Sequence, residues 1–136
     1  MIGITLNKLP IITSSKGETI EWCKNVPGMQ VTFYYRPEHA QFAHHFHKGE
    51  DPSKAPERFL LIQGKVKMTF WNGKDVETAI IYKGTELLIQ PFIYHEAVTL
   101  EDAIFAEYRA TPFDAKSSDV YSREDFIEYL SQHLAN

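Results

Sequence analysis

The sequence predicts an all-β domain, a sandwich or a barrel, followed by one short α-helix. Short segments rich in β-branched and aromatic residues alternate with turn residues along most of the chain. Strands at this spacing are typical of sandwiches and barrels. The last part changes to an apolar repeat of helical period. A chain of 136 residues suits one domain, so we expect a single domain over 1–136, with a barrel over about 9–112 and a helix over about 122–134.

The first two predicted strands lie in a region rich in aromatic residues and histidine. Residues 29–36 (MQVTFYYR) follow the turn pair Pro27-Gly28, and residues 41–47 (QFAHHFH) come next. Side chains alternate between the two faces of a strand. In the second segment, alternation predicts two sets on opposite faces, Phe42, His44 and Phe46 on one and Ala43, His45 and His47 on the other.

Three further strands surround a hairpin signal. Residues 58–63 and 65–71 are both rich in apolar and β-branched side chains, and 75–82 form the return strand. The pair Asn72-Gly73 is typical of a two-residue hairpin turn in which both residues take positive φ. Within 65–71, three apolar side chains share one face: Val66, Met68 and Phe70.

The last two predicted strands are residues 86–90, after the turn Lys83-Gly84, and residues 103–110, after an acidic turn. The helix follows. Ser122 and Asp125 have the spacing of a helix cap, in which a side-chain oxygen accepts a free backbone N–H. Apolar residues then recur at helical spacing, which predicts packing against the outside of the β domain: Phe126, Ile127, Leu130 and Leu134.

Composition and charge exclude several classes of protein. The net charge of −4 and the lack of a basic run argue against a nucleic-acid partner. No apolar run approaches the roughly 18 residues of a membrane span, so we expect no membrane partner. The lone Cys23 cannot form an intramolecular disulfide, and the opening residues do not read as a signal peptide. We therefore expect a cytoplasmic protein.

The histidines are the main candidates for chemistry. Four of the six fall within nine residues, and His45 and His47 would point to the same side of a strand, where two imidazoles can bind one metal ion. His95 lies far along the chain, after another predicted strand. Nearby carboxylates are Glu50, Asp51 and Glu57. The alternative is that these histidines are ordinary surface or hydrogen-bonded residues, because an isolated pair is a weak motif.

These residues resemble the two motifs of the cupin superfamily. His45-Phe46-His47, then Glu57, then Gly64 after six intervening residues, match its first motif, and Pro91 with His95 resembles its second. The similarity spans about residues 29–110. The resemblance implies a jelly-roll double-stranded β-barrel in which three histidines and one glutamate bind a divalent metal inside the barrel, with the ligands His45, His47, Glu57 and His95.

The chain also departs from the cupin pattern. The spacer between His47 and Glu57 holds nine residues, more than the family usually has, and Glu50 lies nearer to the usual distance. Glu50 is not followed by six residues and a glycine, so Glu57 is the preferred ligand. The second motif, PFIYHEAVT, lacks its usual glycine and asparagine.

Flanking segments resemble the RmlC-like sugar-nucleotide cupins. Residues 9–22 are similar to the opening of these proteins, although an arginine of their usual segment is missing. Residues 45–48, 91–97 and 113–130 resemble the WxcM-like dTDP-keto-sugar isomerases. The last of these segments is also similar to cupin domains of capsular-polysaccharide enzymes, and an ordinary capped amphipathic helix explains it equally well.

Two mechanisms fit these residues. In the first, which we expect, a divalent transition metal (Zn, Fe, Mn or Ni) stabilises an enolate of a small polar or sugar-derived substrate. In the second, no metal binds and the resemblance implies a sugar-nucleotide ketoisomerase or epimerase with histidine as acid and base. His45 or His47 would carry the proton, and Tyr94 or Tyr108 would act as donor or stacking surface.

Other classes of function remain as alternatives. A non-enzymatic small-molecule binding or sensing cupin and a metal-dependent dioxygenase would carry the same ligands. A sugar-nucleotide enzyme should have a cationic mouth for the diphosphate, and an oxygenase a more apolar cavity. We also expect a homodimer, because the exposed strand edge at 29–36 would leave backbone groups unpaired.

Overall fold

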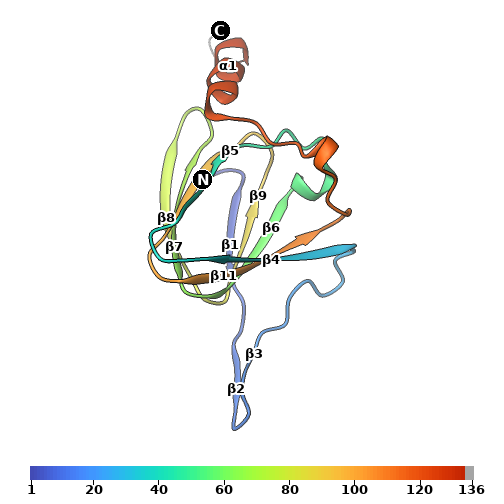
Figure 1. Cartoon of the computed structure of the whole chain (residues 1–136), viewed down its shortest axis with the longest axis vertical. Helices are drawn as coiled ribbons and strands as arrows, with labels where there is room; N and C mark the ends of the chain where they lie inside the picture. The colour runs from blue at the N-terminus through green and yellow to red at the C-terminus, as the bar shows by residue number, and fades with distance from the viewer. Residues whose placement is uncertain (134–136) are drawn as a thin grey trace.

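Two antiparallel β-sheets enclose the interior of the molecule in the computed structural model, which describes residues 1–133 (Figure 1). The five-stranded sheet has the order β1 (Ile4–Lys8), β9 (Thr85–Ile89), β6 (Glu57–Gln63), β11 (Ala103–Arg109) and β4 (Gln30–Arg36). The four-stranded sheet has the order β5 (Gln41–His45), β10 (Tyr94–Thr99), β7 (Lys65–Trp71) and β8 (Val76–Tyr82). The chain crosses repeatedly between the sheets, as in a jelly roll, and the predicted all-β class is confirmed.

The seven predicted strands are present, and four strands were not predicted. β1 joins the five-stranded sheet beside β9, so the barrel begins before the expected residue 9. β2 (Ile12–Ser14) and β3 (Gly17–Thr19) form a separate hairpin that projects away from the barrel (Figure 1). β10 pairs with both β5 and β7 and is the centre of the site described below.

The hairpin between β7 and β8 differs in detail from its prediction. Only Gly73 has a positive φ, of 97°, and Asn72 does not. The N–H of Asn72 donates to the carbonyl of Asp75, and its side-chain Oδ1 accepts from the N–H groups of Lys74 and Asp75 at 2.9 and 2.8 Å. Asn72 therefore stabilises the turn with its side chain, and Gly73 alone supplies the left-handed backbone.

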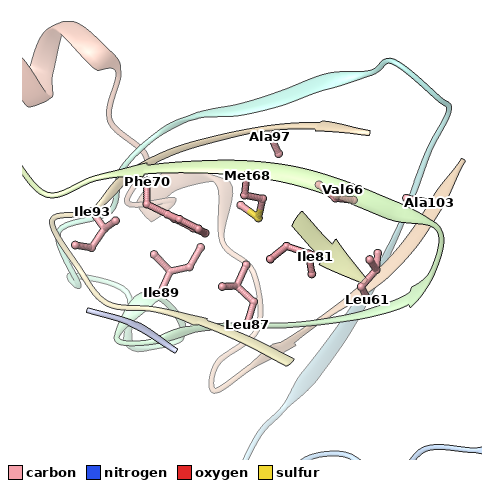
Figure 2. Packing of buried hydrophobic residues seen from close by; sticks show 10 residues of the cluster. All are labelled: Leu61, Val66, Met68, Phe70, Ile81, Leu87, Ile89, Ile93, Ala97 and Ala103. Atoms are coloured by element: carbon pink, nitrogen blue, oxygen red, sulfur yellow. The ribbon is translucent and has the colours of Figure 1, made fainter. Parts of the chain in front are cut away.

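Apolar side chains from both sheets fill the interior. Val66, Met68 and Phe70 share the inner face of β7, as predicted, and are at most 7% exposed. They meet side chains of β6, β8 and β9 in a cluster whose members point toward one another (Figure 2). Besides these three, the cluster contains Leu61, Ile81, Leu87, Ile89, Ile93, Ala97 and Ala103.

The C-terminal helix α1 (Arg123–His133) packs against one end of the barrel (Figure 1). Ser122 caps it as predicted: its Oγ accepts from the N–H of Asp125 at 3.1 Å, and Asp125 Oδ2 accepts from the N–H of Ser122 at 3.0 Å. Phe126 is fully buried, whereas Ile127 is 45% exposed. Phe126 forms a second apolar cluster with Phe46 and Tyr94, against which Leu130 packs; the predicted contact of Leu134 lies outside the described residues.

In the part of the chain that the structure describes, no helix has the length and apolar character needed to cross a membrane.

Candidate active site

A β-bulge in β5 decides which histidines face the interior. His45 pairs with His95, but the next pair is Ala43 with Glu96, so one residue of β5 has no partner. Ala43 and His44 both take positive φ, 71° and 57°. The bulge breaks the predicted alternation: Phe42 and His45 both line the interior cavity, and Phe42 does not share a face with His44. His44 lies on the outer face, with its Nδ1 3.2 Å from Glu96 Oε2.

Three imidazoles converge inside the barrel. His45 ends β5, His47 follows two residues later, and His95 lies beside His45 on β10. One ligand nitrogen from each lies within 4.8 Å of the others. The ring centroids of His45 and His47 are 4.6 Å apart, and those of His45 and His95 are 4.8 Å apart. Side chains from distant parts of the sequence thus form one cluster.

Glu57 is the carboxylate that faces these imidazoles. It opens β6, is 2% exposed, and places Oε2 3.2 Å from His47 Nε2 and Oε1 3.4 Å from His95 Nε2. Glu50 is exposed and accepts a hydrogen bond from the Tyr121 hydroxyl instead. The structure therefore places Glu57, and not Glu50, beside the histidines.

Backbone carbonyls fix the orientation of two of the rings. His47 Nδ1 donates to the carbonyl of Asp119 at 2.7 Å, and His95 Nδ1 donates to the carbonyl of Ile93 at 3.0 Å. Both Nε2 atoms are then directed toward Glu57. The approaches of His47 Nε2 to Glu57 Oε2 and of His95 Nε2 to Glu57 Oε1 lack hydrogen-bond alignment. Among the described residues, the buried atoms His47 Nε2 and Glu57 Oε1 therefore have no hydrogen-bond partner. Three imidazoles and a carboxylate, two of whose buried atoms have no hydrogen-bond partner, form a donor set that fits a divalent transition metal.

A buried lysine also binds the Glu57 carboxylate, at the oxygen that approaches His47. Lys54 Nζ lies 2.8 Å from Glu57 Oε2 and 2.8 Å from Glu107 Oε2. Glu107 also accepts from the Tyr34 hydroxyl at 2.9 Å, and Arg109 binds Asp51 at 2.7 Å. Neither Lys54 nor Glu107 was predicted from the sequence as a residue of the site. For Glu107 the sequence held one signal. It lies two residues after Phe105 in the strand 103–110, so both side chains share a face, and a charged side chain beside an apolar one on an inner face points to a site.

The surroundings give the imidazoles different proton affinities. Burial, together with the neighbouring His95 and His47, lowers the pKa of His45 to about 3. Burial also opposes charge on His47, but the Glu57 carboxylate outweighs it and raises the pKa of His47. Burial disfavours the charged form of Glu57 as well, yet the two histidines and Lys54 hold its pKa well below the usual range. At neutral pH, His45 is neutral and Glu57 is a carboxylate.

A cavity of about 140 Å³ opens beside the imidazoles. His45 and His95 line it, whereas His47 lies behind them. Arg36 is the cationic residue of the lining, and its guanidinium lies 5.2 Å from the ring centre of Tyr34, which also lines the cavity. Most of the wall is apolar. The cationic mouth expected for a diphosphate is therefore represented by a single arginine.

The two tyrosines predicted as donors do not line this cavity. Tyr94 and Tyr108 directly precede His95 and Arg109 in strands where neighbouring side chains point to opposite faces. The Tyr94 hydroxyl donates to Glu96 at 3.3 Å, and that of Tyr108 donates to the Val26 carbonyl at 2.6 Å. Neither hydroxyl is directed into this cavity, whose lining contains Tyr34 instead, and the roles of Tyr94 and Tyr108 as donor or stacking surface stay predictions.

Solved structures with the same architecture include several sugar-nucleotide enzymes. The sugar 3,4-ketoisomerase QdtA from Thermoanaerobacterium thermosaccharolyticum, in complex with TDP, aligns with TM-score 0.79 and 14% identity over 97% of this chain and 97% of that chain. The TDP-fucose-3,4-ketoisomerase WlaRA from Campylobacter jejuni aligns with TM-score 0.74 and 18% identity over 98% of this chain and 99% of that chain. The dTDP-4-dehydrorhamnose 3,5-epimerase from Sulfolobus tokodaii aligns with TM-score 0.69 and 14% identity over 85% of this chain and 74% of that chain.

No family model and no curated protein matches the sequence. The similarity is therefore one of three-dimensional structure, extending over nearly the whole of the ketoisomerase chains. The protein has the cupin jelly-roll fold shared by the dTDP-sugar 3,4-ketoisomerases and 3,5-epimerases.

Proposed function

We propose that the protein is an isomerase or epimerase of a nucleotide-linked keto sugar and that histidine moves the proton without a metal. The observation that carries the proposal is the position of His45, a neutral imidazole on the cavity wall beside His47 and Glu57. The structural neighbours support it, because they are named as TDP-sugar ketoisomerases and epimerases. The metal-dependent mechanism, which was the first expectation from the sequence, becomes the second candidate.

The proposed reaction moves one C–H hydrogen and one O–H proton between adjacent carbons. The His45 imidazole removes the hydrogen from the carbon beside the carbonyl and passes this proton to the carbonyl oxygen, which forms an enediol. The same imidazole then takes the proton of the adjacent hydroxyl, which becomes the new carbonyl, and delivers it to the old carbonyl carbon. Neutral His45 is the base, and the negative charge that develops on the substrate raises its proton affinity.

The remaining residues hold the substrate and the base. Arg36 at the cavity is the group suited to a phosphate oxygen. The Glu57 carboxylate favours a protonated His47 and balances its charge behind His45. Among the neighbours, a QdtA variant with histidine changed to asparagine was solved with TDP-4-keto-6-deoxyglucose, which makes this sugar nucleotide the first substrate to test.

The test compares two adjacent histidines. Wild type, His45→Asn and His44→Asn are incubated with TDP-4-keto-6-deoxyglucose, and conversion to the 3-keto isomer is followed by NMR. We expect His45→Asn to lose at least about 100-fold in kcat, the usual contribution of a general base. His44 points to the outer face, so His44→Asn should retain wild-type turnover. Absence of conversion by wild type, or equal turnover in both variants, would contradict the proposal.

A divalent metal at His45, His47, His95 and Glu57 is the second candidate. The buried, unpartnered His47 Nε2 and Glu57 Oε1 favour it. Zn, Fe, Mn or Ni suits this donor set, and such an ion would act as a Lewis acid on a substrate oxygen. The apolar cavity wall is the feature that a metal-dependent dioxygenase would share.

A further inference from the structure

Lys54 is a buried cation at the edge of the histidine cluster. It is 8% exposed and belongs to the long spacer between His47 and Glu57. The ammonium lies 2.8 Å from Glu57 Oε2 and 2.8 Å from Glu107 Oε2, so it bridges two buried carboxylates. Glu57 Oε2 thereby lies between the Lys54 ammonium and His47 Nε2, and Oε1 faces His95 Nε2.

The local backbone holds Lys54 in this position. It ends the short 3-10 helix Pro52–Lys54, which Asp51 caps by accepting from the N–H of Ser53 at its carboxylate and from the N–H of Lys54 at its backbone carbonyl, both at 2.9 Å. Asp51 is itself bound to the buried Arg109 at 2.7 Å. The lysine is therefore anchored at its backbone as well as at its ammonium group.

The charges of the cluster disfavour a second cation. A metal ion binds imidazoles only in their neutral form. In that state the carboxylates of Glu57 and Glu107 and the Lys54 ammonium that bridges them carry a net charge of −1, and the Asp51–Arg109 pair adds no net charge. A divalent ion would give +1 and would lie close to the Lys54 ammonium in a low-dielectric interior, where repulsion is strong. Without Lys54 the cluster would carry −2, which a divalent ion neutralises.

We propose that Lys54 suppresses metal binding at the three imidazoles, because its ammonium takes one oxygen of Glu57 and supplies the charge that a metal would bring. A donor set that otherwise fits a metal ion is thereby kept free for proton transfer. This inference concerns the same residues as the proposed function but does not depend on the sugar substrate.

Zinc titration of chelator-treated protein tests the proposal directly. Isothermal calorimetry should show Zn²⁺ binding to Lys54→Met at least about tenfold tighter than to wild type, which corresponds to about 1.4 kcal/mol. Lys48→Met is the matched control. Lys48 lies on the same segment, but its Nζ lies 4.1 Å from the centre of the Tyr121 ring. The Lys48→Met variant should therefore bind zinc with the affinity of wild type.

A second variant covers the case in which Lys54→Met does not fold, since removing the lysine leaves two buried carboxylates unpaired. The double variant Lys54→Met/Glu107→Gln removes one positive and one negative charge and leaves Glu57 as the free carboxylate. Its net charge equals that of wild type, but Glu57 Oε2 is free and no ammonium lies beside the ion, so it should also bind zinc more tightly than wild type and gain thermal stability when zinc is added. Equal zinc affinity in wild type and the folded variants, or zinc retained by wild type at one equivalent after chelation, would overturn the inference. Neither result depends on turnover of the sugar nucleotide.

Discussion

His45 and His47 are two residues apart in the chain, yet their imidazoles have different neighbours. His45 lies on the cavity wall between two other imidazoles, and His47 lies behind it, between the Asp119 carbonyl and the Glu57 carboxylate. The first environment favours the neutral ring and the second favours the charged ring. The neutral ring on the cavity wall can therefore accept a proton from a substrate, whereas the ring behind it does not reach the cavity.

The lowered pKa of His45 predicts a specific loss of stability in mild acid. Below its ordinary pKa of 6.5, the unfolded chain binds a proton at His45, whereas the folded protein does so only near pH 3. The free energy of unfolding therefore falls as pH decreases from 6.5 toward 3. The raised pKa of His47 has the opposite sign: it adds stability below 6.5 that is lost as pH rises through the folded value.

Comparison of wild type with His45→Asn isolates the loss of stability in mild acid that comes from the lowered pKa of His45. From about pH 7.5 to about pH 5, wild type should lose roughly 1–2 kcal/mol more of its unfolding free energy than the variant. Urea unfolding of chelator-treated protein at the two pH values measures this difference. Identical losses in the two proteins would show that folding does not shift the pKa of His45.

The elements of the fold were predictable where the signal is local. The strands from β4 to β9 carry β-branched and aromatic residues and are bounded by turn residues. β1, β2 and β3 lack this signal because their side chains are mostly exposed and polar. The bulge at Ala43 and His44 depends on pairing with β10, and no local pattern in the sequence reports it.

The candidate site also contains residues that were predictable from the sequence and residues that were not. His45, His47, Glu57 and His95 were identified from spacing and resemblance to a motif. Lys54 lies three residues before β6 and reaches Glu107 because β6 and β11 are neighbours in one sheet, with Glu107 paired to Phe59. Such long-range pairing is set by tertiary structure and is not encoded in any short stretch of sequence.

Helix α1 depends on one buried aromatic side chain. Phe126 is fully buried and contacts Phe46 and Trp71, with ring centres 5.0 Å away in each case. Phe126→Ala should lower the free energy of unfolding by about 3–5 kcal/mol, because it removes apolar contacts and leaves a cavity. Ile127→Ala on the exposed side of the same helix should cost less than about 1 kcal/mol. Chemical denaturation measures both, and equal effects would contradict this packing.

At the scale of the whole molecule, β4 presents an unpaired edge and an apolar outer face. It is the last strand of the five-stranded sheet, and Val31, Phe33 and Tyr35 are 47%, 57% and 68% exposed. Backbone groups at such an edge and apolar side chains beside it both gain from a partner. These features support the homodimer expected from the sequence.

Light scattering coupled to size-exclusion chromatography measures this association. Wild type should elute with the mass of two chains, and Phe33→Glu should shift it toward one, because a charge is costly in an apolar interface. Val76→Glu changes a residue that is 66% exposed on β8, at the edge of the other sheet, and should leave the mass unchanged. A monomeric wild type would refute the prediction.

In the proposed reaction, the histidines of the barrel move a proton on a keto-sugar nucleotide without a metal ion. The most direct measurement is the rate at which chelator-treated protein converts TDP-4-keto-6-deoxyglucose, before and after addition of one equivalent of Zn²⁺, Mn²⁺, Ni²⁺ or Fe²⁺. The structure predicts turnover by the chelator-treated protein at its full rate, with no gain from any of the four ions. Turnover that is absent after chelation and restored by one of the ions would contradict the claim.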